Sequence, residues 1–145
     1  MQHFKRFGGA LALGLALVLA LASGCKPSES PAPAPAAFAV KGVSLGSSIG
    51  ADKRVANPTR AFAKGDTIYA SVETDGASPS VTLAARWTYE GGQLVNESSQ
   101  AIAPTGPAAT EFHIAKPDGW PAGTYKVEIS ANGVVVASQE FSVAQ

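Results

Sequence analysis

The residues in this sequence best suited to chemistry are a glutamate and a histidine with one residue between them, Glu111 and His113. Side chains two positions apart on a strand point to the same face, so these two would lie side by side. A carboxylate and an imidazole are both ligands that zinc accepts. His113 is, however, the only histidine after residue 3, and no histidine cluster accompanies it. We expect Glu111 and His113 to form a solvated surface pair, and a metal site there is the alternative.

No other residue pattern indicates catalysis, a bound cofactor or a nucleic-acid partner. The carboxylates are scattered, and no nucleophile has an acid or base at a recognisable spacing. Gly91-Gly92 falls between two strand patterns, whereas a phosphate-binding loop precedes a helix. With 11 basic and 11 acidic residues the formal charge is 0, and nucleic-acid binding requires concentrated positive charge. We therefore expect a non-enzymatic protein without a cofactor.

The single cysteine, Cys25, follows a segment with the features of an export signal. Residues 1–9 are basic, residues 10–22 are an uncharged apolar run, and Ser23-Gly24 are small. The apolar run is too short to cross the roughly 30 Å hydrocarbon core of a bilayer comfortably. A basic start, a short apolar run and small residues before a cleavage site are typical of a secretory signal peptide. We expect residues 1–24 to be removed; a permanent N-terminal anchor helix is the alternative.

The end of this signal, Leu21-Ala22-Ser23-Gly24-Cys25, resembles the lipobox of bacterial lipoproteins. It departs from the family pattern at Ala22, where leucine is usual. The resemblance implies cleavage before Cys25, attachment of diacylglycerol to its thiol, and acylation of the new amine by a fatty acid such as palmitate. An ordinary free or buried cysteine that merely follows the cleavage site is the alternative, and the lack of a second cysteine to pair with Cys25 counts against it.

Lipidation of Cys25 would fix the location of the protein. Each buried methylene contributes about 0.8 kcal/mol, and a single acyl chain binds a membrane only marginally, so two or three chains are needed for a stable anchor. In Gram-negative lipoproteins an aspartate after the cysteine favours retention in the inner membrane, and here that residue is Lys26. The resemblance therefore implies an envelope protein anchored in the outer membrane and facing the periplasm.

The mature chain divides into a linker, residues 25–37, and a domain, residues 38–145. The linker reads KPSESPAPAPAA after Cys25, and its proline-alanine alternation favours an extended left-handed conformation. At about 3.1 Å per residue it would hold a domain up to roughly 35 Å from the membrane. Removal of the signal takes away two basic residues and leaves a charge of about −2. The remaining length is that of one domain.

Alternation of apolar and polar residues predicts an all-β domain. The segment 67–74, for example, places Ile68 inside and Ser71 outside. Asn132-Gly133 is a strong hairpin signal, because both central residues of such a turn need positive φ. The final segment changes phase, which predicts a β-bulge within 137–140. About seven strands are expected, near 39–45, 67–74, 81–89, 93–100, 111–115, 124–130 and 134–143, with 51–64 mostly loop.

Strand number and length favour a single antiparallel immunoglobulin-like β-sandwich. Trp87 falls inward on the third strand, where such sandwiches often bury a tryptophan. The stretch DGWPAGTYKVEI, residues 118–129, resembles the corner before the sixth strand of immunoglobulin-like and fibronectin-type domains. The resemblance implies that the Tyr125 hydroxyl bonds back to nearby backbone. Val127 stands where an antibody-type domain has its second cysteine, which excludes the disulfide-bonded variant.

We expect a membrane-anchored lipoprotein whose domain serves protein–protein contact or envelope assembly. A sandwich offers edge strands to which a partner can add a strand, and 93–100 is the candidate edge, with Leu94 and Val95. Trp120 and Tyr69 are the aromatic residues expected to be partly exposed. Trp120 is a third candidate contact, although a tryptophan in a corner turn more often packs over the end of the core than binds a partner. The alternatives are a periplasmic small-ligand or metal-binding module, or an inhibitor of an envelope hydrolase acting through loop 103–109.

Overall fold

The structure is a computed structural model that describes residue 34 and residues 36–145. The expected signal peptide, Cys25 and most of the expected linker lie outside the described residues. The described part contains eight β-strands and no helix, and therefore no helix long and apolar enough to cross a bilayer. The all-β prediction is confirmed.

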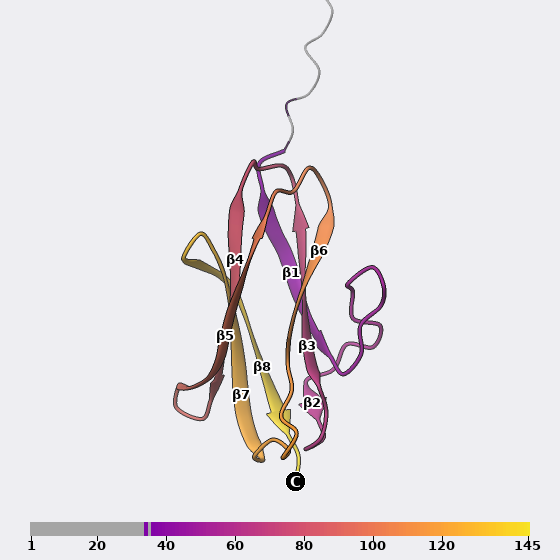
Figure 1. Ribbon diagram of the computed structural model, residues 1–145, viewed down its shortest axis with the longest axis vertical. Helices are drawn as coiled ribbons and strands as arrows, with labels where there is room; N and C mark the ends of the chain where they lie inside the picture. Colours follow the sequence, from indigo (N-terminus) through magenta and orange to yellow (C-terminus); the bar gives the residue numbers. More distant parts are fainter. Residues whose placement is uncertain (1–33, 35) are drawn as a thin grey trace, which may run out of the picture. The chain divides into compact units, whose positions relative to one another are not determined.

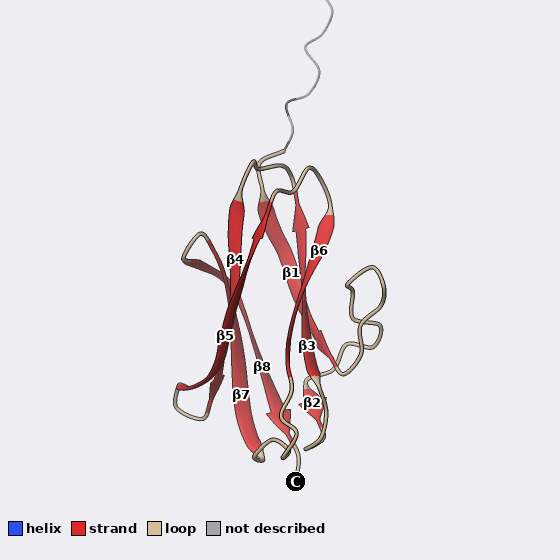
Figure 2. Cartoon of the chain, viewed as in Figure 1, coloured by secondary structure: helices blue, strands red, loops and turns tan. Residues whose placement is uncertain are grey.

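The strands form two sheets that pack face to face (Figure 1, Figure 2). One sheet has the order β1-β3-β6, and the other has the order β2-β8-β7-β4-β5. With β2 set aside, β1, β3 and β6 take the places of immunoglobulin strands A, B and E, and β5, β4, β7 and β8 those of C′, C, F and G. The predicted immunoglobulin-like sandwich is confirmed. The strands are β1 (Ala39–Gly46), β2 (Ala61–Phe62), β3 (Ile68–Asp75), β4 (Val81–Tyr89), β5 (Gln93–Ile102), β6 (Ala108–Ile114), β7 (Gly123–Ala131) and β8 (Val134–Val143).

The core lies between the sheets and consists of the inward side chains of their strands. Trp87 is 0% exposed and meets the ring of Phe141 edge to face, with centroids 5.9 Å apart. The ring of Tyr125 stacks on the same phenylalanine, Phe141, and the two ring centroids are 5.3 Å apart. Aromatic contacts of this geometry contribute about 0.5–1.5 kcal/mol beyond the area that they bury. The other large residues that are almost wholly buried are Ile68, Val72, Val81, Leu83, Val127 and Ile129.

The segment 51–64, which the sequence predicts as mostly loop, contains a short strand. Ala61 and Phe62 form the short strand β2, which pairs in parallel with Ser142 and Val143 of β8. Phe62 is buried, and the described domain has eight strands rather than the seven expected. Two residues are too few to show a period, so only their pairing with β8 identifies them as a strand.

Ser71, which the alternation of polar and apolar residues places on the outside, is buried. It is 1% exposed, and its Oγ donates a hydrogen bond to the carbonyl of Lys53 at 2.7 Å. The connection between β1 and β2 thus covers part of the outer face of β3. A buried hydroxyl needs such a partner, because an unpaired one would destabilise the fold.

The predicted bulge in the last strand is present, one residue earlier than expected. Ile129 pairs with Ala137 and Ser130 pairs with Val135, so Val136 has no partner across the ladder. The turn before it has φ of 49° at Asn132 and 83° at Gly133, the left-handed conformation that the hairpin signal predicts.

The corner before β7 is held by aromatic side chains that donate hydrogen bonds to its backbone. The Tyr125 hydroxyl donates to the carbonyl of Pro121 at 2.7 Å, which is the contact that the corner resemblance implies. The Tyr89 hydroxyl donates to the carbonyl of Ala122 at 3.0 Å. The two tyrosine rings lie 4.7 Å apart. The corner therefore presents a fixed backbone to the end of β5 and β6.

Tyr125→Phe is expected to lower the free energy of unfolding by about 1 kcal/mol near neutral pH, because one internal hydrogen bond is lost. Burial raises the pKa of Tyr125 above its ordinary 10.0, with smaller contributions from Tyr89 and Glu90. An acid whose pKa is raised by folding stabilises the folded state below its unfolded pKa, and this contribution disappears as pH rises through the folded pKa. Urea unfolding from about pH 8 to about pH 12 should show the gap between wild type and variant narrowing. A gap that stays constant would contradict this assignment.

Candidate functional site

Two sheet edges that have no neighbouring strand among the described residues lie on the same side of the sandwich. β5 ends the five-stranded sheet and β6 ends the three-stranded sheet. They approach each other where the Gln100 side chain of β5 donates from Nε2 to the backbone carbonyl of Glu111 on β6. In an antiparallel strand the N–H and C=O of one residue point to the same side, so Glu111 and His113 both turn their backbone groups away from β3.

β5 is exposed on both of its faces. The residues opposite the core positions Trp87, Ala85 and Leu83 of β4 are Asn96, Ser98 and Gln100. These three side chains are polar, and all are exposed. β5 therefore completes the sheet by backbone pairing but leaves this part of the space toward β6 open to solvent.

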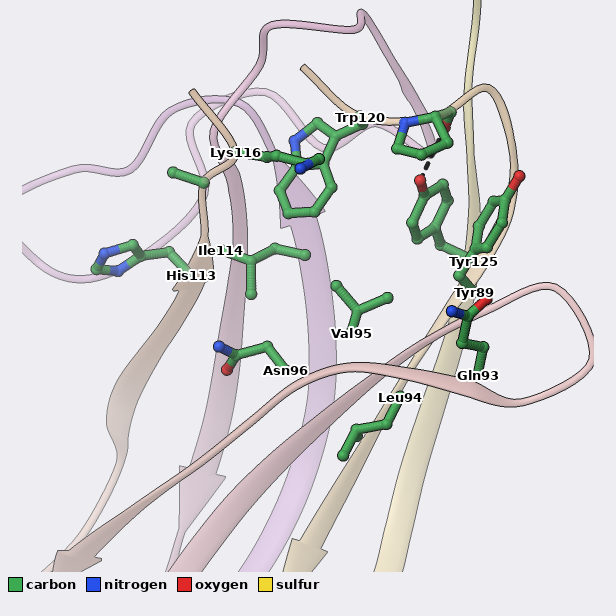
Figure 3. Close-up of a pocket in the computed structure, with 12 residues that line it drawn as sticks. Tyr89, Gln93, Leu94, Val95, Asn96, His113, Ile114, Lys116, Trp120 and Tyr125 are labelled. Atoms are coloured by element: carbon green, nitrogen blue, oxygen red, sulfur yellow. Dashed lines mark hydrogen bonds between the residues drawn. The ribbon is translucent and has the colours of Figure 1, made fainter. Parts of the chain in front are cut away.

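A second bulge, which the sequence analysis does not predict, lies at Val95. Trp87 pairs with Asn96 and Thr88 pairs with Leu94, so Val95 is the extra residue on β5. A bulge bends its strand and re-aims a side chain. At this bend a groove of about 580 Å³ opens between β5, the end of β6 and the corner before β7 (Figure 3). It is lined by Tyr89, Gln93, Leu94, Val95, Asn96, His113, Ile114, Ala115, Lys116, Trp120, Pro121 and Tyr125.

The three residues expected to contact a partner all line this groove, with different exposures. Leu94 is 52% exposed, whereas Val95 is half-buried and packs against the core. Trp120 is only 4% exposed, and its Nε1 donates to the carbonyl of Asp66 at 2.8 Å. Trp120 is therefore buried rather than partly exposed, and its indole packs over the end of the core, which is the alternative expected for a tryptophan in a corner turn. The bulge that brings these residues together leaves no mark in the alternation of β5.

Glu111 and His113 lie side by side on β6, as their spacing predicts. Nδ1 of His113 is 2.9 Å from Oε1 of Glu111, and the histidine side chain is 56% exposed. The Tyr69 ring of β3 lies beside the imidazole, with centroids 5.4 Å apart. Among residues 36–145 no group of three histidine, cysteine, aspartate or glutamate side chains is placed to hold a metal ion. The geometry is that of a surface pair.

The loop expected to project from the domain, 103–109, is tied to its neighbours. Pro104 is buried, and its carbonyl accepts a hydrogen bond from the backbone of Ser78 at 3.0 Å. Thr105 forms an isolated bridge with Ala77. Ala77 also bonds to the chain segment just before β1, because its backbone N–H donates a hydrogen bond to the carbonyl of Ala36 at 2.8 Å. Among the described residues, backbone pairing thus begins at Ala36.

Comparison with known proteins supports the fold and does not assign a family. No family model matches the chain, and no curated protein matches it. The alkylpurine DNA glycosylase AlkC of Pseudomonas fluorescens aligns at 16% identity and a TM-score of 0.50, over 77% of this chain and 32% of the glycosylase. A β-glucosidase of Erythrobacter marinus aligns at 7% identity and a TM-score of 0.50, over 74% of this chain and 15% of the enzyme.

An immunoglobulin-like protein of Pseudomonas aeruginosa aligns at 12% identity and a TM-score of 0.48, over 75% of this chain and 98% of that protein. The chain spans less than a third of the glycosylase and less than a sixth of the glucosidase. Likeness at these identities concerns the fold alone. The strand order and the corner at Tyr125 define the class: the described domain is an immunoglobulin-like β-sandwich.

Proposed function

We propose that this chain is a lipid-anchored lipoprotein of the bacterial cell envelope whose immunoglobulin-like domain binds another envelope protein through the edge of β5. The main support for this contact is the position of β5 at the edge of the five-stranded sheet. β5 is a strand of 10 residues that pairs, within the described part of the chain, only with β4, and eight of its side chains are exposed. A long unpaired edge is a ready template for another strand.

The free backbone groups of this edge can be assigned from the register. Thr82 of β4 exchanges hydrogen bonds with Asn132, so its backbone groups point to the β7 side. Its partner on β5, Ala101, therefore directs its own N–H and C=O away from β4, and so do Ser99 and Glu97. Edges that are protected against pairing usually carry lysine, proline or a bulge. β5 contains no lysine or proline, and its bulge at Val95 lies before the free positions Glu97, Ser99 and Ala101.

The anchor in this proposal rests on Cys25 and its lipobox-like surroundings. Lys26 favours the outer membrane, and the proline-rich linker would hold the domain in the periplasm at a distance from its anchor. A bound partner and a membrane anchor together would make the protein a tether between a membrane and a soluble or integral envelope component.

Site-specific photocrosslinking in intact cells tests the β5 contact. A photoreactive residue at Ser99, on the free edge, is expected to give a covalent adduct with an envelope protein. The matched control is Ser142, which is also exposed but lies on β8 where that strand pairs on both sides. Adducts at Ser99 and not at Ser142 would support the proposal. No adduct at either position, or equal adducts at both, would contradict it.

The volume of the groove favours a second candidate function, the binding of a small ligand. The volume of about 580 Å³ lies within the range of 300–1,000 Å³ that is usual for small-molecule sites. In that case periplasmic extract freed of protein should shift the amide resonances of groove residues. Crosslinking at Ser99 would then find no protein.

A further inference from the structure

The groove between β5 and β6 has an electrostatic character that identifies the kind of segment it fits. Lys116 is the only lysine or arginine among its lining residues, and no aspartate or glutamate lines it. Within the described part of the chain, no ion pair involves Lys116. The groove thus combines apolar side chains with one lysine that has no described ion-pair partner, and this lysine complements a negative group on an occupant.

Val95 and Ile114 are two of these apolar side chains, and both line the groove together with Lys116. Ile114 is 4% exposed at the end of β6, and Figure 3 shows its side chain and that of Val95 pointing toward one another across the groove. Lys116 follows Ile114 by two residues. Lys116 itself lies just beyond the end of β6. Same-face side chains at i and i+2 of an extended partner segment lie about 6.6 Å apart.

The backbone beside this pair is free to accept a strand. His113 has the same parity as Glu111, so its N–H and C=O point away from β3. Glu111 already accepts a hydrogen bond from Gln100, whereas no described side chain bonds to the backbone of His113. An extended segment in the groove would therefore find one backbone residue to pair with.

We propose that this groove takes an extended segment of a partner protein that carries an aliphatic side chain and an acidic side chain two residues apart. The aliphatic side chain lies between Val95 and Ile114, and the carboxylate lies beside Lys116. The inference rests on the proposed function, because it names the chemistry of the partner that meets the β5 edge. The occupant is an acidic side chain within a chain and not a chain terminus, since the groove provides a lysine and no cluster of backbone N–H groups.

Peptide selection against the full chain in detergent micelles tests this inference. A library of random decapeptides, displayed with both ends covered, is expected to enrich an aliphatic–x–acidic pattern. The Lys116→Glu chain should enrich a basic residue at the acidic position. Lys41→Glu is the matched control, because Lys41 is an exposed lysine on β1 at the opposite edge of the same sheet, and its selection should match wild type.

Affinity measurements on the selected peptides give the expected magnitude. Lys116→Gln should weaken binding about fivefold, the size of an exposed to half-buried ion pair. Val95→Thr, which keeps the shape of the side chain, should weaken it by a similar factor. Enrichment without an acidic position, no enrichment, or the same pattern from wild type and Lys116→Glu would each overturn the inference.

Failure of this inference is separable from failure of the proposed function. Adducts at Ser99 in cells together with peptide patterns that ignore Lys116 would keep the β5 contact and reject the groove. The acidic pattern without adducts at Ser99 would keep the groove as a peptide site and reject the contact along the β5 edge.

Discussion

Trp87→Ala is expected to lower the free energy of unfolding by about 3–5 kcal/mol, the largest effect of any single substitution in the described core. Trp87 is 0% exposed and lies on β4, which pairs with β5 on one side and with β7 on the other. Its removal would leave a cavity beside Phe141, whose ring it meets at 77°. The loss is the sum of the transfer free energy of the indole and the cavity that the sheets cannot close.

Trp87→Phe separates the volume of this side chain from its polar atom. Nε1 of Trp87 is buried, and no described residue accepts a hydrogen bond from it. An unpaired buried N–H destabilises the folded state by about 1–3 kcal/mol. Phenylalanine removes the N–H while keeping an aromatic ring, so its cost should be less than half that of alanine.

Urea unfolding followed by circular dichroism measures both variants. Trp120→Phe provides the matched comparison, because the Nε1 of Trp120 is bonded to the carbonyl of Asp66 and that bond would be lost. A Trp87→Phe chain that loses as much stability as Trp87→Ala would contradict the account of the unpaired N–H. A loss below about 2 kcal/mol for Trp87→Ala would show that the core closes around the cavity.

Features set by neighbours in the sequence could be predicted, because their signals are local. Asn132-Gly133 marks a turn whose positive φ angles few other residue pairs adopt, and the structure has that turn. Alternation located β4 and β7 to within a residue or so at each end, since one face of each is fully buried. β6 begins at Ala108, three residues before the expected start, because Ala108-Ala109 carries no apolar–polar contrast.

Features set by partners across the fold could not be predicted. β2 is a strand only because β8 lies beside it, and Ser71 is buried only because the loop containing Lys53 covers it. The burial of Trp120 depends on a carbonyl 54 residues away in the chain. Each of these depends on contacts between residues far apart in sequence, which a local pattern does not contain.

In the candidate site, too, the individual residues could be predicted from the sequence, whereas their arrangement in space could not. Its residues could be named one by one, since Leu94 and Val95 are apolar residues on a polar strand. Their assembly into a groove follows from the unpaired position of Val95, which is a matter of register between β4 and β5. The bulge takes Leu94 to the outside and turns Val95 toward Ile114, so that one strand supplies both an exposed edge and the wall of a groove.

Release of the chain from the membrane is the largest effect expected outside the described domain. A chain with a secretory leader of the ordinary cleaved type in place of residues 1–24, and with Cys25→Ser, should move from the membrane fraction almost entirely to the soluble periplasmic fraction. The reason is the loss of two or three acyl chains, each of which contributes about 0.8 kcal/mol per buried methylene. The domain should keep its fold, because the substitution lies outside residues 38–145, which supply the buried core that the structure describes.

Fractionation and mass spectrometry of the same cells measure this outcome. The native chain should begin at Cys25 and carry the mass of diacylglycerol and an acyl group, whereas the variant should have the mass of its polypeptide alone. Ser28→Ala, in the same linker and with the native leader, is the matched control and should stay with the membrane. An unmodified Cys25 in the native chain, or a variant that stays in the membrane fraction, would contradict the anchor. Because crosslinking at Ser99 probes the domain and fractionation probes Cys25, the anchor and the partner contact can each fail without the other.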